Sequence, residues 1–540
     1  MRIRFLLLSL AAACAAVAQP LDLLITNGRV VDGSGNPWYN ADVGIRGGAI
    51  VEIGKLSGRS AKRTIDARGQ VVAPGFVDLM GGRSLPLLLD PDSAASKLRQ
   101  GITTMFAGEG SSDAPHTDQT FPQEARRAGY NWRTYGEYFQ VLEKRGIALN
   151  VVHNVGAAQI RRIVLGDEDR APNAEELKRM QALVSQAMRD GAVGVSTALI
   201  YPPGTYAKTE ELVALARAAG EYGGIYSTHM RNESSALLEA IAESIEIGEK
   251  AGVPVHIYHL KAAGQDNWPL MPKAIEAIRA ARARGLDVTA DIYPYIRNGL
   301  GLGSFLHPRH YARGSAPFLK TLDDPAVRER LRREVETTTD WENWYRHVGS
   351  DWDNVLIASA ADKSYEGKSV AEVAKMRNAD VWATFFDLVR NGRTSVNPKS
   401  MDEAQKHLAM RADFVSFCTD ASPTNQAKAT GAHPRAFGSF PRILAKYVRE
   451  EQVVSLEEAI RKMTSLAANR VHVYDRGRIA VGQQADIVIF DPARIRDTAD
   501  FTNPLGFPEH LPYVIVNGQV AVDDGRMTAV KAGRALRARR

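Results

Sequence analysis

The sequence has 540 residues, of which 44% are hydrophobic and 24% charged, so the chain can bury the core of a large domain and a smaller one. Its formal charge of +6 corresponds to the arginines at positions 2 and 4 and to four arginines in 534–540, which leaves the rest of the chain balanced. This composition indicates neither nucleic acid nor an anionic membrane as a partner.

Residues 1–18 have the pattern of a cleaved export signal. Two arginines precede an apolar run over 5–17, and Ala16-Val17-Ala18 forms a small-residue cleavage site. The run is shorter than the roughly 20 residues that span a bilayer, which disfavours a retained anchor; a lipid anchor at Cys14 is a minor alternative. We therefore expect a periplasmic or extracellular protein. Its one remaining cysteine, Cys418, excludes an intrachain disulfide.

The two ends of the mature chain carry β-strand patterns. Apolar runs with turn residues between them occur in 19–72, for example at 23–31, and again in 471–530, for example at 485–490. Neither end alone has enough strands to bury a face. We expect both to meet in one small composite β-sandwich domain.

The middle of the chain, 73–470, alternates short apolar runs with amphipathic segments. Asn173 with Glu176 indicates a helix start and Gly191 its end, and similar signals recur at Thr209, Gly252 and Gly285. Eight such alternations predict an α/β fold of the distorted (β/α)8 TIM-barrel type, with an open sheet as the alternative. The expected strands are 75–78, 103–107, 150–153, 194–197, 225–229, 254–260, 287–291 and 414–418.

One stretch, at about 300–412, is too long for a single connection between barrel elements. We expect it to form an inserted lid or subdomain over the barrel mouth.

Two histidines, His229 and His259, each close one of the apolar runs. The carboxyl ends of barrel strands carry the reactive groups of this fold, so two imidazoles on successive strand ends can converge on one metal ion. The other histidines, including His153 and His256, are expected to be structural or surface groups.

Many short motifs, in order along almost the whole mature chain, resemble those of the amidohydrolase superfamily, and in particular the N-acyl-D-amino-acid deacylases, or D-aminoacylases. The resemblance implies a composite sheet domain beside a distorted barrel, with a metal site that hydrolyses a linear amide. The matching stretches are 73–78, 101–104, 196–203, 228–233, 259–261, 293–295, 419–421, 433–435 and 438–442.

The same resemblance implies roles for single residues. His229 and His259 fall on the two retained histidine ligands, and Asp420 falls on the aspartate that acts as general base and acid. Lys261 and Tyr293, with Tyr295 beside it, fall near the substrate, and Arg435 or Arg442 could pair with the substrate carboxylate. Each has an ordinary structural alternative, such as a solvated lysine, a tyrosine packed in the barrel, or an arginine that braces the loop after Asp420.

Two departures from the superfamily pattern concern the metal. Where a His-x-His pair is usual, the chain has Met80 and Gly82, so the first metal position is expected to be empty. Where the best-known deacylases have Asn-Cys-Gly, the chain has Gly108-Glu109-Gly110. The resemblance places their cysteine ligand at Gly110, and the neighbouring Glu109 can reach the same ion with a carboxylate. The alternative is a buried Glu109 paired with a base such as Arg83.

These features predict one divalent ion on Glu109, His229 and His259, with Zn²⁺ as first choice and Mn²⁺, Co²⁺ or Fe²⁺ as alternatives. The predicted activity is hydrolysis of a small N-acyl-D-amino acid to a D-amino acid and a carboxylate. A cyclic-amide hydrolase of the hydantoinase and dihydroorotase type is the first alternative, although the expected fourth strand ends without the lysine that those enzymes usually carboxylate. A catalytically inactive binding protein with the same fold is the second.

Overall fold

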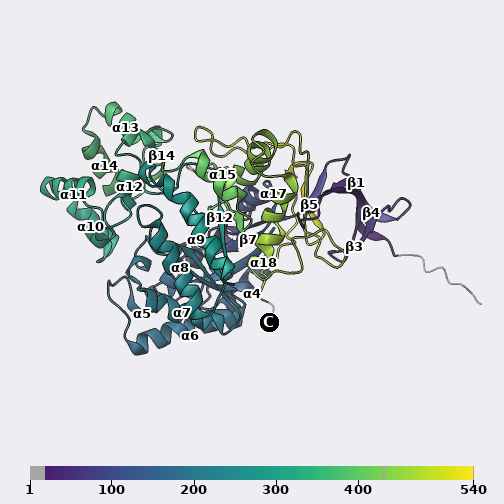
Figure 1. The fold of residues 1–540 in the computed structure, drawn as a ribbon, viewed down its shortest axis with the longest axis horizontal. Helices are drawn as coiled ribbons and strands as arrows, with labels where there is room; N and C mark the ends of the chain where they lie inside the picture. The colour runs from purple at the N-terminus through teal and green to yellow at the C-terminus, as the bar shows by residue number, and fades with distance from the viewer. Residues whose placement is uncertain (1–18, 430–431, 539–540) are drawn as a thin grey trace, which may run out of the picture.

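A computed structural model describes residues 19–429 and 432–538 of the chain. The expected export signal, 1–18, lies outside the described residues. Three parts follow one another along the long axis of the molecule: a small sheet at one end, a barrel in the middle and a helical insertion at the other end (Figure 1).

The small sheet combines strands from both ends of the chain. Its order is β20-β19-β18-β17-β5-β1-β2-β3, with β4 paired to β1. The two ends join where β17 runs antiparallel to β5, with Val488 opposite Ala73. Apolar side chains that alternate along these strands form a separate small core. The strands are Leu21–Val30, Tyr39–Arg46, Ala49–Gly54, Ala61–Asp66, Val71–Pro74, Ile487–Phe490, Tyr513–Val516, Gln519–Asp523 and Arg526–Met527.

The barrel contains eight parallel strands in the order β16-β12-β11-β10-β9-β8-β7-β6. All eight predicted runs are strands of this sheet, and the predicted barrel is confirmed. The strands are buried along their whole length, as expected for a parallel sheet that helices cover. They are β6 Phe76–Asp78, β7 Ile102–Ala107, β8 Asn150–Gly156, β9 Gly194–Ala198, β10 Ile225–His229, β11 Val255–Ile257, β12 Val288–Ile292 and β16 Val415–Phe417.

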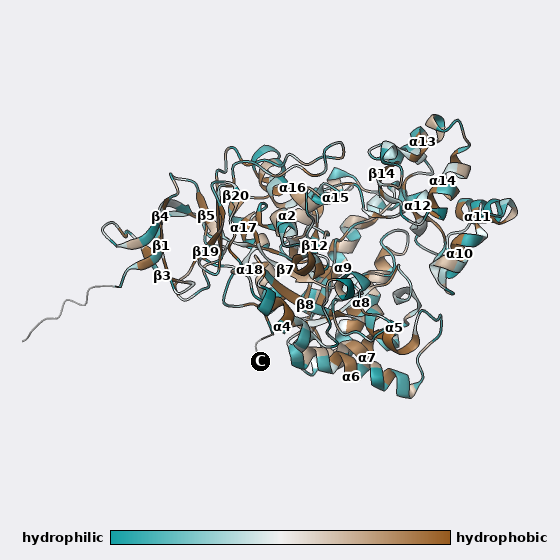
Figure 2. Cartoon of the chain, turned by 180° about the vertical axis from the view of Figure 1, so that it is seen from behind, coloured by the Kyte–Doolittle hydropathy of each residue, from teal (hydrophilic) through white to brown (hydrophobic). Residues whose placement is uncertain are grey.

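Helices cover the outside of the barrel, and Figure 2 shows their mixed hydropathy against the mostly apolar strands. Asn173 and Glu176 form the predicted capping box of α6, and Gly252 ends α8 in the left-handed conformation. Thr209 is the first residue of α7 rather than its cap, because Lys208 precedes the helix without a side-chain cap. The main barrel helices are α4 Tyr135–Arg145, α5 Ala157–Leu165, α6 Ala174–Asp190, α7 Thr209–Gly220, α8 Leu237–Ala251, α9 Met271–Ala283, α15 Glu403–Arg411, α16 Arg435–Arg442, α17 Leu456–Met463 and α18 Ser465–Arg470.

The insertion has its own hydrophobic core, formed by residues between Leu300 and Val396. The chain returns to the barrel before the 412 boundary expected from the sequence, because α15 packs on α9, β12 and β16 of the barrel. The insertion contains β13 Leu300–Gly301, β14 Val355–Ser359 and β15 Ser395–Pro398 in one sheet, with helices α10 Ser315–Thr321, α11 Pro325–Thr337, α12 Trp344–His347, α13 Val370–Met376 and α14 Val381–Arg390.

The last described residues return to the barrel. Arg534 accepts a hydrogen bond from the backbone of Val151, and Val151 accepts one from Leu536. Among the described residues, no helix has the length and apolar character needed to cross a membrane.

Candidate metal centre and active site

Three predicted ligands meet at the carboxyl end of the barrel. His229 is the last residue of β10, while Glu109 and His259 lie two residues beyond the ends of β7 and β11. His259 has a φ of 35°, a left-handed conformation that is uncommon for a non-glycine residue and that often marks a functional site. The backbone N–H of His259 donates to Oδ1 of Asp291 at 2.6 Å, which fixes this turn.

The geometry of the three side chains fits a divalent cation. Oε1 of Glu109 lies 3.0 Å from Nδ1 of His229 and 3.5 Å from Nε2 of His259. One ligand atom from each residue lies within 4.8 Å of the other two. Two imidazole nitrogens and one carboxylate oxygen form the set that holds catalytic zinc and leaves a position open.

The electrostatics of the centre also favour a positive charge. Burial raises the pKa of Glu109, but hydrogen bonds from His229 and His259 bring it down to about 2. Burial and Lys261 lower the pKa of His259, yet the carboxylates of Glu233 and Glu109 raise it to about 9. The negative field that stabilises a protonated ring here also favours a metal cation between the same groups.

Glu233 lies close to both histidines of the candidate centre. Its Oε1 lies 2.9 Å from Nδ1 of His259, and its Oε2 lies 3.6 Å from Nε2 of His229. Nζ of Lys261 donates to both oxygens, at 2.6 and 2.7 Å. A carboxylate on the far nitrogen of a ligand imidazole fixes its tautomer and orientation.

The insertion contributes a second acid to this cluster. Oε1 of the buried Glu342 accepts the backbone N–H of Glu233 at 2.9 Å. Burial and the negative charge of Glu233 raise the pKa of Glu342 to about 8. Through Glu233, the insertion therefore contacts the histidines of the candidate metal centre.

Asp420 follows the last barrel strand and faces the same cavity. Its φ is 49°, and its Oδ2 accepts a hydrogen bond from Nη1 of Arg435. Burial raises the pKa of Asp420, and the positive charge of Arg435 opposes that rise. The Arg435 guanidinium also lies 4.9 Å from the centre of the Tyr293 ring, so Arg435 contacts both Asp420 and Tyr293.

All seven predicted site residues line one cavity of about 150 Å³. Tyr295 and Arg442 are absent from its lining: the Tyr295 hydroxyl donates to the carbonyl of Pro434, and Arg442 pairs with Asp497. The lining is formed by Glu109, Tyr201, His229, Glu233, His259, Lys261, Tyr293, Asn298, Gly299, Leu300, Trp344, Asp420 and Arg435.

The surroundings of Arg83 and Gly110 bear on the assignment of Glu109. Arg83 pairs with Asp113 at 2.9 Å, so it is not the partner of Glu109. A Cβ placed on Gly110, whose φ is +62°, would lie 2.8 Å from the backbone nitrogen of Ala198. Position 110 of this chain therefore has no room for a side chain, whereas residue 109 faces the two histidines.

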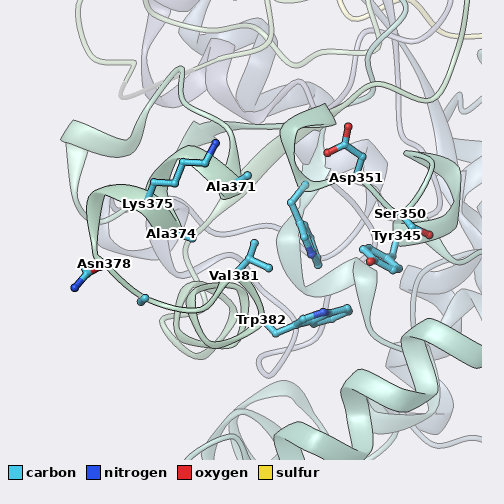
Figure 3. Close-up of a pocket in the computed structure, with 11 residues that line it drawn as sticks. Tyr345, Ser350, Asp351, Ala371, Ala374, Lys375, Asn378, Val381 and Trp382 are labelled. Atoms are coloured by element: carbon cyan, nitrogen blue, oxygen red, sulfur yellow. The ribbon is translucent and has the colours of Figure 1, made fainter.

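A second hollow, of about 860 Å³, lies on the insertion, away from these residues. Tyr345, Val381 and Trp382 line it together with Asp351 and Lys375 (Figure 3). It contains none of the predicted site residues.

Several residues that line the cavity or contact its lining were not identified from the sequence. Glu233 stands four residues after His229, within a motif already singled out, so its spacing was an available signal. Glu342 and Trp344 come from the insertion, and no local pattern distinguishes them from other acidic and aromatic residues there.

Comparisons with known proteins agree with this architecture. The model of the Amidohydrolase family matches residues 386–522. The D-aminoacylase of Alcaligenes xylosoxydans xylosoxydans is 34% identical over 528 residues, which cover 96% of this chain and 98% of that protein. The N-acyl-D-glutamate deacylase of the same organism is 32% identical, over 96% and 97% of the two chains.

Solved structures give the same result. A crystal structure of D-aminoacylase superposes with a TM-score of 0.80 at 30% identity, over 96% of this chain and 100% of that one. The N-acyl-D-glutamate deacylase from Bordetella bronchiseptica, complexed with zinc and a phosphonate inhibitor, gives the same TM-score of 0.80 at 30% identity, with coverage of 96% and 100%. A D-hydantoinase from Thermus sp. gives 0.56 at 17% identity and shares the fold alone. By this similarity along almost its whole length, the chain belongs to the D-aminoacylase family of amidohydrolases.

Proposed function

We propose that this protein is a metal-dependent deacylase that hydrolyses N-acyl-D-amino acids at the Glu109, His229 and His259 centre. The observation that carries the proposal is the convergence of these three ligands with Asp420 and Arg435 on one cavity. A divalent ion bound there would supply a Lewis acid that polarises the amide carbonyl and makes water more acidic.

Asp420 is the proposed general base and acid. Its carboxylate accepts a proton from the water that attacks the acyl carbon, and a carbon–oxygen bond forms. When the carbon–nitrogen bond breaks, the same proton passes to the leaving amine, so one water is consumed and an amino acid and a carboxylic acid are released. General acid–base catalysis of this kind contributes about 10² to 10⁴-fold to rate.

The positive charges in the cavity support a substrate with one carboxylate. Lys261 and Arg435 are the basic residues in its described lining, and each already pairs with an acid, Glu233 or Asp420. Arg297 directly precedes the lining residue Asn298, but its Nη1 donates to the carbonyls of Asn354 and Asn397 at 2.8 and 3.0 Å. We therefore do not count it as a substrate-binding residue. We propose that Arg435 or Lys261 binds the α-carboxylate of the substrate.

The rest of the lining supports a neutral substrate side chain. Tyr201, Leu300 and Trp344 also line the cavity, and they carry no formal charge. Once the α-carboxylate occupies one of the two bases, a second carboxylate, as in an N-acyl-D-aspartate or N-acyl-D-glutamate, would face only the other base, whose charge its own acid already balances. Burying such a charge costs several kcal/mol. We therefore propose the N-acyl derivatives of neutral D-amino acids as the substrate class.

The test is a panel of N-acetyl-D- and N-acetyl-L-amino acids, assayed with the protein loaded with Zn²⁺, Co²⁺ or Mn²⁺. We expect N-acetyl-D-leucine or N-acetyl-D-methionine to exceed N-acetyl-D-glutamate by about 10²-fold or more in kcat/KM, the size expected for an unpaired buried charge. Faster hydrolysis of the acidic substrates would contradict the neutral class. Bound metal without turnover of any open-chain amide would contradict the deacylase, and hydrolysis of hydantoin or dihydroorotate instead would favour the cyclic-amide alternative.

The expected export and its periplasmic or extracellular destination stay proposals, which we base on the arginines, apolar run and small residues of 1–18. Cell fractionation together with N-terminal sequencing of the mature protein tests them. A mature chain that begins at Gln19 in the periplasm or medium is the expected result.

A further inference from the structure

The barrel sheet ends in two edge strands, β6 and β16. Among the described residues no backbone ladder pairs these two strands, and side-chain hydrogen bonds connect their ends instead. Asp78, the last residue of β6, accepts two hydrogen bonds from Thr419, which follows β16 by two residues. The backbone N–H of Thr419 donates to Oδ1 at 2.9 Å, and its hydroxyl donates to Oδ2 at 2.6 Å. This closure lies directly before Asp420.

Lys97 lies at the centre of the closure. It belongs to the short helix α2 (Ala95–Leu98), and its side chain is fully buried. Its Nζ donates to Oδ2 of Asp78 at 2.7 Å, to the hydroxyl of Thr419 at 2.6 Å and to the carbonyl of Ala421 at 2.6 Å. All three N–H groups of the ammonium therefore have acceptors, which is the condition for keeping a buried charge.

Two of the three acceptors flank the proposed general base. Thr419 and Ala421 precede and follow Asp420, whose backbone is in the left-handed region with a φ of 49°. A non-glycine residue in that region is strained by about 1 to 3 kcal/mol and keeps the conformation only where its surroundings impose it. The bonds from Lys97 to both neighbours supply that constraint.

We infer that Lys97 is a positioning residue for catalysis: with Asp78 and Thr419 it fixes the backbone at 419–421 so that the Asp420 carboxylate points into the cavity. The inference rests on the proposed function, which assigns proton transfer to Asp420. Lys97 itself does not line the cavity, and the proposed metal ligands come from other strand ends. Its removal therefore acts on Asp420 and leaves the metal ligands in place.

The test is Lys97→Met in the full-length protein loaded with metal. We expect kcat to fall about 10- to 100-fold, because a misplacement of about 1 Å costs up to 10²-fold, while KM and the bound metal stay unchanged. Removing a positive charge near Asp420 also raises the pKa of its carboxyl, so the acidic limb of the kcat profile should move to higher pH.

Lys462→Met is the matched control. The Lys462 side chain is equally buried, and its Nζ donates to the carbonyls of Met410 and Ala412, but it is outside the cavity lining. We expect this variant to lose stability while the folded enzyme keeps its kcat and its acidic limb. If both lysine variants change kcat and the pH profile alike, the effect is a general one of buried charge and the inference is wrong.

Thr419→Val is a milder variant for the case in which Lys97→Met does not fold. It removes the hydroxyl that contacts both Lys97 and Asp78, and we expect a smaller loss of kcat with the metal retained. Wild-type kcat and pH profile in a folded Lys97→Met, or in Thr419→Val, would overturn the inference. Asp420→Asn separates the two hypotheses: if it keeps full turnover, the proposed role of Asp420 fails, whereas if it is inactive and the Lys97 variants are normal, only the positioning role fails.

Discussion

The two halves of the barrel mouth carry different residues beyond their strand ends. At the ends of β10 and β11, His229 and His259 face a cavity together with Glu109. At the end of β6, where the superfamily has a His-x-His pair, Met80 is buried in an apolar cluster and Gly82 lies against the loop after Asp420. In the first half nitrogen and oxygen atoms line a cavity, whereas the second half is filled by protein. We therefore expect the barrel to keep one metal position and to lack the other.

The largest expected effect comes from the base that serves the open half. Asp420→Asn should lower kcat by about 10² to 10⁴-fold, because the amide cannot accept the proton of the attacking water. The bound metal, measured by elemental analysis, should not change. Asp497→Asn is the matched control, since Asp497 is a partly buried acid that also pairs with an arginine, Arg442 at 3.2 Å, and it is outside the cavity lining. An undiminished rate in Asp420→Asn would refute the role of this residue.

The next effect concerns Glu109, the predicted carboxylate ligand. Glu109→Ala should weaken Zn²⁺ binding by more than the 10- to 100-fold typical of residues behind the ligands, as measured by competition with a chromophoric chelator. Glu211→Gln is the control, because Glu211 is a buried acid paired with Arg161 at 2.6 Å and away from the metal centre. Unchanged affinity in Glu109→Ala would mean that the ion binds elsewhere.

A third experiment tests whether histidines placed after β6 can bind a second metal ion. Gly82 has a φ of +73°, and a Cβ placed on it would lie 2.4 Å from Oγ of Ser422. The double variant Met80→His, Gly82→His should therefore lose about 1 to 3 kcal/mol of stability through overpacking and should bind no additional ion. Met80→His alone is the control variant, because it keeps Gly82 and so adds no Cβ next to Ser422. A stable double variant that binds two equivalents of metal would show that only the missing histidines, and not a lack of space, prevent a metal from binding at this half of the barrel mouth.

The smallest effect separates a structural histidine from the ligand histidines. Burial lowers the pKa of His153, within β8, to about 4, and its Nε2 lies 2.8 Å from the hydroxyl of Ser84. A folded-state pKa below the unfolded value of about 6.5 stabilises the protein above pH 6.5, and this contribution is lost as the pH falls toward 4.

His153→Gln should therefore reduce the loss of stability between pH 7 and pH 4.5 relative to wild type, as measured from urea unfolding midpoints. The absolute stability of the variant at pH 7 is not the readout, because Gln also changes the packing. An identical pH dependence in the two proteins would show that His153 does not contribute to acid sensitivity.

Local sequence patterns were enough to predict the barrel strands and the two histidines that meet at the barrel mouth. The barrel strands are short and largely apolar, and helix caps such as Asn173 with Glu176 depend on a few adjacent residues, so neighbouring positions carry the information for both. Histidines at strand ends are predictable for a related reason: parallel strands of a barrel present their carboxyl ends on one face, so His229 and His259 must lie near each other.

The groups that complete the centre depend on the assembled fold. Arg435 and Lys261 were expected to bind substrate, but their pairing with Asp420 and Glu233 depends on loops that the barrel brings together. Glu342 reaches the centre from the insertion, and Lys97 reaches the flanks of Asp420 from a helix more than 300 residues earlier in the chain. Contacts of this kind leave no local pattern, because they form only after the barrel closes and brings its first and last strands together.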